Sequence, residues 1–145
     1  MSYNPLPTVA ISSRKIARNY TNGSGSTVSK GVLMSTLSNG NVIPVDVSNL
    51  VSADSIVGFY NQATPSAASG SVIDSGILEN ITTSYVVGTP VYIDTTGNLT
   101  NIAPSVGING FLSGYSVIFA GILVKNEFNP AWIDLKILIQ KVGTL

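Results

Sequence analysis

The chain has 145 residues, and its seven basic and seven acidic side chains cancel to a formal net charge of zero. Its length fits one domain, and only 10% of its residues are charged, against about 25% in an average soluble protein. It contains no cysteine and no histidine, which excludes disulfides, thiolate nucleophiles, cysteine-based zinc sites and the commonest general base. Most enzyme mechanisms are excluded with them, so we expect a protein that is not an enzyme and holds no cofactor.

The first 25 residues are predicted to form an extended N-terminal arm. Pro5 and Pro7 favour extended backbone, and the stretch Tyr20–Ser26 is rich in Gly, Ser and Asn. A short strand at Val9–Ile11 is the one regular element expected there. The segment lacks a basic start followed by an apolar run, so we expect the protein to stay in the compartment where it is made.

Residues 26–145 are predicted to form one all-β domain, a compact β-barrel or sandwich. From Thr27 onward, short apolar runs are separated by Asn-Gly, Thr-Gly, Ser-Gly and Pro, and no window sustains a helical period. The longest apolar stretches are interrupted by glycine or by charged residues. A membrane span needs about 20 consecutive apolar residues, so none is expected.

Two predicted hairpins in this domain match one another. Residues 31–43 and 88–100 each begin with glycine and carry a Gly-Asn pair at the turn. Glycine there accepts the left-handed backbone that tight hairpins need. The alignment places Met34 on Val91, both within strands.

A second match lies farther along the chain, where residues 69–80 resemble residues 113–126 once single-residue insertions are allowed. Together the two matches predict a duplicated β-unit, with copies at about 27–80 and about 84–126. Neither copy is long enough to bury its own strands. We therefore expect a pseudo-twofold pair of units closed over one shared core.

The C-terminal stretch 132–142 is predicted to be a strand. Between Ile133 and Ile139, isoleucine and leucine occupy every second position and a mixed set occupies the others, which indicates one apolar face. The preceding Asn129–Trp132 is expected to form a turn that anchors Trp132 against the barrel.

The sequence contains no recognisable catalytic or metal-binding motif. The carboxylates have local roles, as at Asp94, which precedes a Thr-Thr-Gly turn. Calcium needs several oxygen ligands at close spacing, and a serine nucleophile without histidine needs a suitably placed lysine. Neither pattern is present, so we expect no metal and no catalytic site.

Aromatic side chains leave one binding function open. Flat rings stack on sugars, and a platform for a glycan would draw on the residues Tyr60, Tyr85, Tyr92, Tyr115 and Trp132. The same residues serve equally as core and interface anchors of a β-domain, which is the commoner use. Glycan binding is kept as the alternative, and a glycan is not an expected partner.

Charge is distributed unevenly along the chain. Residues 1–45 carry four bases and no acid, whereas residues 46–100 carry five acids and no base. The basic beginning is expected to meet an acidic surface on a neighbouring copy or another partner. Binding to phosphate backbones generally uses a larger basic stripe, so nucleic acid is not an expected partner.

The second half of the chain resembles small β-rich capsid decoration, cement or head-fibre proteins of tailed bacteriophages. The resemblance rests on Val87-Gly-Thr-Pro-Val-Tyr-Ile-Asp-Thr-Thr-Gly-Asn-Leu-Thr, then Val106-Gly, Gly110-Phe-Leu-Ser-Gly-Tyr and Phe119-Ala-Gly-Ile-Leu-Val. It covers about 85–142 and, through the duplication, 30–80. These are β-turn phrases, not catalytic signatures, and no single functional residue is carried over.

The resemblance implies a virion protein that is synthesised in the host cytoplasm and lies on the capsid surface. There it would bridge neighbouring major capsid subunits and stabilise the shell. It would also bind itself as a dimer or trimer, through exchange of the arm or addition of a strand at a sheet edge. The alternative is a phage receptor-binding or carbohydrate-binding β module.

Nine residues at the two ends of the chain are the candidate interface. They combine apolar side chains with the basic residues of the arm. They are Tyr3, Leu6, Val9, Ile11, Arg14, Lys15, Arg18, Trp132 and Leu138.

Overall fold

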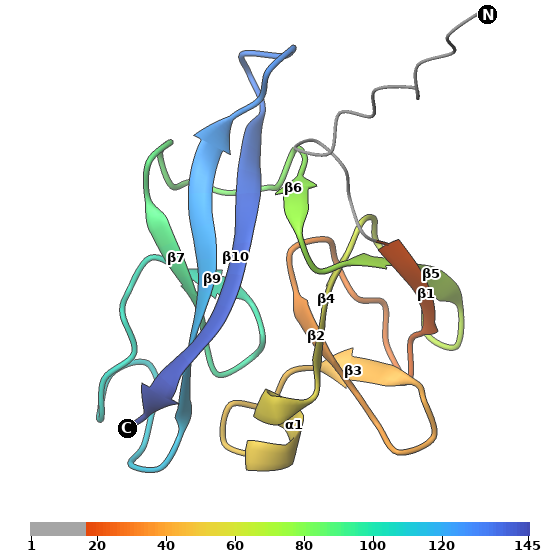
Figure 1. Cartoon of the computed structure of the whole chain (residues 1–145), viewed down its shortest axis with the longest axis vertical. Coiled ribbons are helices and arrows are strands. Elements are labelled where there is room, and N and C mark those ends of the chain that lie inside the picture. Colours follow the sequence, from red (N-terminus) through yellow and green to blue (C-terminus); the bar gives the residue numbers. More distant parts are fainter. Residues whose placement is uncertain (1–16) are drawn as a thin grey trace, which may run out of the picture.

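The computed structural model of the chain describes residues 17–145, in which two five-stranded antiparallel sheets pack against each other (Figure 1). The all-β class expected from the sequence is confirmed, in the form of a sandwich. The predicted strand at Val9–Ile11 lies outside the described residues.

The first sheet is formed by the amino-terminal half of the described chain, and its strands lie in the order β1-β5-β4-β2-β3. The strands are β1 (Ala17–Thr21), β2 (Leu33–Thr36), β3 (Val42–Pro44), β4 (Ile56–Tyr60) and β5 (Ser69–Ile73). One short helix, α1 (Leu50–Asp54), joins β3 to β4.

The second sheet is formed by the carboxy-terminal half, and its strands lie in the order β6-β10-β9-β7-β8. The strands are β6 (Gly76–Leu78), β7 (Pro90–Ile93), β8 (Leu99–Thr100), β9 (Ser116–Lys125) and β10 (Ile133–Thr144). The strand predicted at 132–142 is β10.

The two sheets share one strand order. In each sheet the first strand of that half lies beside the fifth, followed by the fourth, the second and the third. The hairpins matched in the sequence, at 31–43 and 88–100, are the β2–β3 and β7–β8 pairs, so they occupy equivalent places.

The sheets also share a pairing register. Met34 on β2 lies opposite Gly58 on β4, and a β-bulge follows. Val91 on β7 lies opposite Gly121 on β9, again followed by a bulge. Both glycines have positive φ, at 129° and 150°. The positions that the sequence placed on each other, Met34 and Val91, are equivalent in three dimensions.

The second sequence match joins parts that are not equivalent. Residues 69–80 contain β5 and β6, which belong to different sheets, whereas residues 113–126 contain the single strand β9. By strand order the counterpart of β9 is β4. The sheets also divide the chain between β5 and β6, not at the boundaries predicted for the repeats. Duplication of the sequence itself stays a prediction.

The two sheets do not pack about a pseudo-twofold axis, which corrects the expectation from the sequence. Gly58 and Gly121 occupy equivalent positions, so the residues that follow them, Phe59 and Ile122, are equivalent as well. The next pair of equivalent residues is Tyr60 and Leu123. Phe59 and Leu123 meet in the shared core, while Tyr60 belongs to a separate cluster and Ile122 lies outside both. Opposite faces of equivalent strands therefore meet, and the sheets stack front to back.

The far side of the first sheet has a core of its own, which explains the front-to-back packing. The connection between β1 and β2 folds over this side and buries Val28 and Val32 against Met34 and Tyr60. A twofold pairing through this face would require that connection to leave. The first sheet therefore offers its other face to the second sheet.

The start of the described chain is part of the first sheet, where the sequence predicted an arm through residue 25. All five residues of β1 pair with β5, from Ala17 opposite Ile73 to Thr21 opposite Ser69. Asn22 is 1% exposed, and its side-chain amide donates to the Thr64 carbonyl at 2.9 Å. Backbone pairing and this buried amide supply the stabilisation that the segment's small side chains lack.

Trp132 is not anchored in the core. The turn predicted over Asn129–Trp132 forms, with the Trp132 N–H donating to the Asn129 carbonyl at 3.1 Å. The indole, however, is 37% exposed. The core side chains of β10 are instead Leu135 and Ile137, because the chain reverses at this turn beyond the end of the other sheet.

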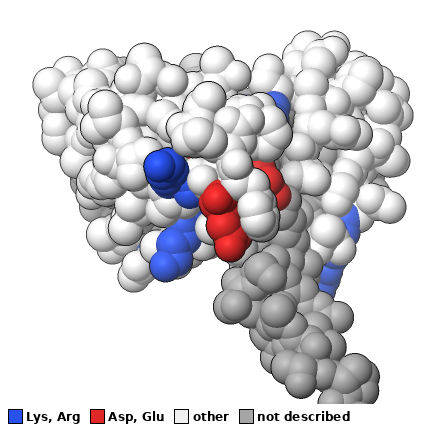
Figure 2. All heavy atoms as spheres, turned by 90° about the horizontal axis from the view of Figure 1, so that it is seen from above, with Lys and Arg blue, Asp and Glu red and all other residues white. Residues whose placement is uncertain are grey.

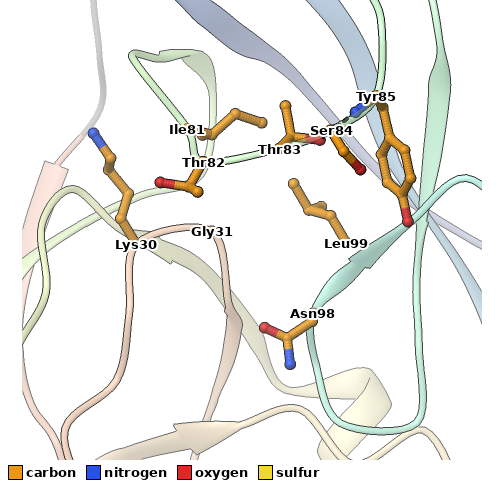
Figure 3. Close-up of a pocket in the computed structure, with 9 residues that line it drawn as sticks. All are labelled: Lys30, Gly31, Ile81, Thr82, Thr83, Ser84, Tyr85, Asn98 and Leu99. Carbon is orange, nitrogen blue, oxygen red and sulfur yellow. Dashed lines mark hydrogen bonds between the residues drawn. The ribbon is translucent and has the colours of Figure 1, made fainter.

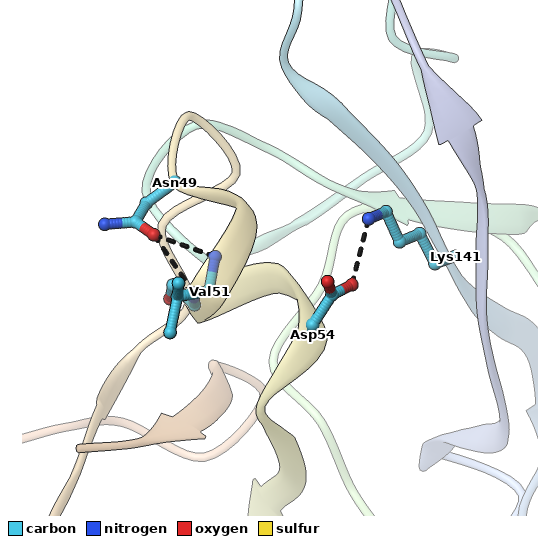
Figure 4. A network of polar contacts seen from close by, with 5 residues as sticks. Asn49, Val51, Asp54 and Lys141 are labelled. Atoms are coloured by element: carbon cyan, nitrogen blue, oxygen red, sulfur yellow. Dashed lines mark hydrogen bonds and ion pairs between the residues drawn. The ribbon is translucent and has the colours of Figure 1, made fainter. Parts of the chain in front are cut away.

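A polar contact connects α1 to the second sheet (Figure 4). The Asn49 side chain caps the helix by accepting from the Val51 and Ser52 amides. At the other end of α1, Asp54 accepts from Lys141 Nζ on β10 at 2.9 Å. The Lys141 side chain is partly exposed and that of Asp54 is more than half exposed, so the pair adds little to the free energy of unfolding.

The bulge glycines give a sharp test of the shared register. A Cβ on Gly121 would collide with the Lys136 carbonyl oxygen, whereas a Cβ on Gly88 would meet nothing within 4 Å. We expect Gly88→Ala to cost about 1 kcal/mol, from its positive φ alone. Gly121→Ala should cost at least about 3 kcal/mol, because β10 must move away. Urea unfolding measures both, and equal losses would contradict the bulge geometry.

Tyr60 predicts a loss of stability at alkaline pH. Its hydroxyl donates to the Tyr20 carbonyl at 2.8 Å, and burial raises the pKa of this phenol above its ordinary value of 10.0. The unfolded state therefore releases this proton first, and the free energy of unfolding falls as pH rises from the unfolded pKa to the folded one.

The control for this test is Tyr60→Phe, which loses the hydrogen bond at every pH but cannot ionise. Urea unfolding at pH 8 and at about pH 11 should show a smaller alkaline loss in the variant than in the natural chain. An identical loss in both would show that Tyr60 does not carry the effect.

Candidate interaction surface

The most buried carboxylate of the described chain serves the structure of a turn. Asp134 is 3% exposed and accepts from the Asn80 amide at 2.9 Å and from Asn126 Nδ2 at 3.0 Å. The Asn126 side chain in turn accepts from the backbone amides of Phe128 and Asn129. In residues 17–145, no three acidic side chains converge to hold a metal. This network instead fixes the hairpin between β9 and β10.

A hollow with mostly polar lining lies where the halves of the chain meet (Figure 3). It has a volume of about 270 Å³ and is lined from three segments, 30–31, 81–85 and 98–99. Much of its polar lining is already used. Lys30 Nζ donates to the Glu79 carbonyl at 2.6 Å, and the Thr83 hydroxyl accepts from the Tyr85 amide at 3.0 Å. The hollow offers hydroxyl groups but no acid or base aligned for catalysis.

The tyrosines that were considered for a sugar platform do not come together. Tyr60 is buried in the far cluster, and Tyr85 lines the polar hollow. Tyr92 packs against Phe119 with ring centroids 5.5 Å apart, on the outside of the second sheet. Tyr115 packs edge-on against another aromatic ring, in the loop before β9. Each ring has a separate packing role.

Charged groups are sparse on the end of the molecule shown in Figure 2. Its described surface is mostly uncharged, and the charged atoms form a few small groups. Uncharged surface of this kind is available for apolar contact, because little desolvation of ions opposes it.

Exposed apolar side chains gather where β9 ends. Phe128, at the tip of the β9–β10 hairpin, is 86% exposed, and Trp132 follows in the same turn. Val86 and Val87 are also exposed. They lie near the end of β9, because the next residue, Gly88, donates its N–H to the carbonyl of Leu123 on β9 at 2.7 Å. We call these four residues the hairpin end.

A second exposed group lies where β9 begins, about 30 Å from the hairpin end along the strand. The loop before β9 is anchored by Phe111, which is buried in the shared core. Around this anchor the loop exposes four aliphatic side chains. We call them the loop end: Ile102, Val106, Ile108 and Leu112.

Three of the nine predicted interface residues lie in the described chain. Arg18 is exposed on β1, while Leu138, 44% exposed, lies on β10 and Trp132 lies at the hairpin end. They belong to different surfaces, so the structure does not bring them together. The other six lie outside the described residues: Tyr3, Leu6, Val9, Ile11, Arg14 and Lys15.

Sequence reasoning missed the most exposed aromatic residue and the whole loop end. Phe128 has polar neighbours, in Lys-Asn-Glu-Phe-Asn-Pro, and the loop lies in Asn-Ile-Ala-Pro-Ser-Val-Gly-Ile-Asn-Gly. These exposed residues could have been predicted from isolated apolar residues within turn-forming segments. Turns lie at the surface, so the apolar side chains in them are exposed to solvent.

The described chain has no helix with the length and apolar character needed to cross a membrane. Comparison with protein-family models and with curated proteins finds no match to this chain. Its function must therefore be inferred from its surface, and the features of that surface are two exposed apolar ends in a weakly charged β-sandwich.

Proposed function

We propose that the chain is a non-enzymatic structural protein of a bacteriophage virion. It binds the outer surface of the capsid, bridges neighbouring major capsid subunits and so stabilises the shell. The observation that carries this proposal is the display of apolar side chains at both ends of β9, with Phe128 at one end and Leu112 at the other.

The spacing of the two ends suits a bridge. A ten-residue strand holds them about 30 Å apart, and β9 is paired on both sides, so the distance is fixed. Two separate contacts on a rigid body can engage two neighbouring subunits together. Each contact then raises the effective concentration of the other, which turns weak contacts into firm attachment.

The way each end is built also supports a binding role. The buried Asp134–Asn126 pair holds the turn that displays Phe128, and the buried Phe111 holds the loop end. Apolar residues on fixed turns lose little conformational entropy when they bind, whereas residues on unsupported loops must first be ordered.

Phe128→Ser tests the hairpin end, with Val51→Ser on α1 as its control. Both side chains are more than 70% exposed, so neither variant should change the folded state measurably. Particles that lack the protein are incubated with each variant, and occupancy and heat resistance of the shell are measured. We expect Val51→Ser to behave as the natural chain and Phe128→Ser to bind at least about tenfold more weakly.

The outcomes separate the surface from the function. If all variants protect the shell equally, the hairpin end is not the contact. If the natural chain neither binds particles nor changes their resistance to heat, the capsid function is wrong. A glycan array with strong hits abolished by Tyr85→Ala would instead favour the carbohydrate-binding alternative, since Tyr85 lines the polar hollow.

A further inference from the structure

The outer face of the second sheet is apolar and has no layer packed on it in the described chain. Along β9 the residues that alternate with the shared core are half-buried and almost all apolar, and Tyr92 and Leu138 extend the same character to the neighbouring strands. Lys136 and Gln140 are polar members of this side, and Asp134 lies on the same side opposite Val124, where the hairpin network buries it. We call this surface the bare face and define it by Tyr92, Val117, Phe119, Ile122, Val124 and Leu138.

The corresponding face of the first sheet already packs against a sheet. Through the shared register, Phe119 corresponds to Ile56 and Ile122 corresponds to Phe59. Phe59 is fully buried in the shared core, and Ile56 packs against it. In the described chain, the first sheet therefore has this face covered by the second sheet, whereas the equivalent face of the second sheet is uncovered.

Front-to-back stacking cannot continue from one copy to the next. A copy placed on the bare face in that manner would have to offer the far side of its first sheet. That side is closed by Val28 and Val32, which are buried over it. A head-to-tail contact, which would build an open filament, is thus blocked, and the bare face of a second copy is the available uncovered sheet face.

The size and charge of the bare face suit such a contact. β9 and β10 run the length of this face, whereas β7 and β6 cover four and three residues of it. With strands about 4.8 Å apart and about 3.3 Å per residue, the area is about 450 Å² on each copy. Two copies would bury about 900 Å², a size typical of weak, reversible contacts. The formal net charge of zero means that no overall repulsion opposes association.

Lys136 is a cation on this side of the sheet, beside the β6 edge, and its position favours a dimer axis away from that edge. It pairs with Ile77 on β6, the edge strand, and with Ile122 on the other side. Its aliphatic stem can cover Ile77 while the ammonium stays in water at the rim. The centre of the contact then lies over β9 and β7, around Phe119 and Tyr92.

We propose that the bare face packs against the bare face of a second copy, giving a closed twofold dimer. Its two inner sheets would face each other about 10 Å apart, as stacked sheets do. The contact is centred away from the hairpin end but borders it, because Val124 and Phe128 line one hollow. The proposal does not depend on capsid binding, since self-association is measured without capsids.

Sedimentation velocity across the micromolar range, on the full chain, tests the proposal. The natural chain should sediment at twice the 15.1 kDa chain mass. Leu138→Lys places a second cation on the bare face and should raise the dimer dissociation constant at least about tenfold. Val51→Lys is the control, since Val51 is even more exposed but lies on α1, and it should leave the constant unchanged.

A variant with the opposite effect guards against a folding artefact. Lys136→Ile removes a cation at the edge of the bare face and should tighten the dimer, a gain that misfolding cannot imitate when thermal unfolding is unchanged. A monomer at every concentration would overturn the proposal, and so would a trimer. Equal weakening by Leu138→Lys and Val51→Lys would overturn the assignment to the bare face.

Discussion

The structure depends on one packing arrangement between the two sheets. The face of the first sheet that carries Phe59 packs against the face of the second sheet that carries Leu123. These side chains are fully buried in one continuous core. Neither sheet could be stable alone, because each needs a second layer to remove its apolar face from water. The arrangement joins equivalent sheets through non-equivalent faces, which leaves residues 17–145 with one closed side and one side on which no further layer packs.

Polar groups in this fold are used to shape turns. Asp134 and Asn126 hold the β9–β10 hairpin, and the Asn22 side chain secures the connection that covers the first sheet. Among the described residues no buried side-chain nitrogen or oxygen atom lacks a hydrogen-bond partner. Fully satisfied polar groups have no unused capacity for a ligand, and this directs attention to the apolar surface. Function is accordingly proposed for the exposed ends of β9, not for a pocket.

The two proposed contacts are compatible in one particle. A dimer centred on Phe119 and Tyr92 would leave both loop ends free and would keep Phe128, which lines one hollow with Val124, at the rim of the contact. It would carry four shell-binding sites in place of two. Multivalent attachment of this kind strengthens binding without any new type of contact, provided that the sites can be engaged together.

The sequence by itself determined the all-β class and the two matched hairpins, because a glycine turn and strand alternation act over a few neighbouring residues. Local signals also predicted the alternation in β10. Local signals could not decide which face of a strand packs against the other sheet, because they do not show which distant segment covers each face. Tyr60 and Trp132 show the difference. The sequence left Tyr60 open as a solvent-facing platform and predicted that a turn anchors Trp132 against the barrel, whereas Tyr60 is buried and Trp132 is 37% exposed. Only the tertiary structure decided these positions, since burial depends on which distant segment covers a face, and that choice belongs to the packing of the whole chain.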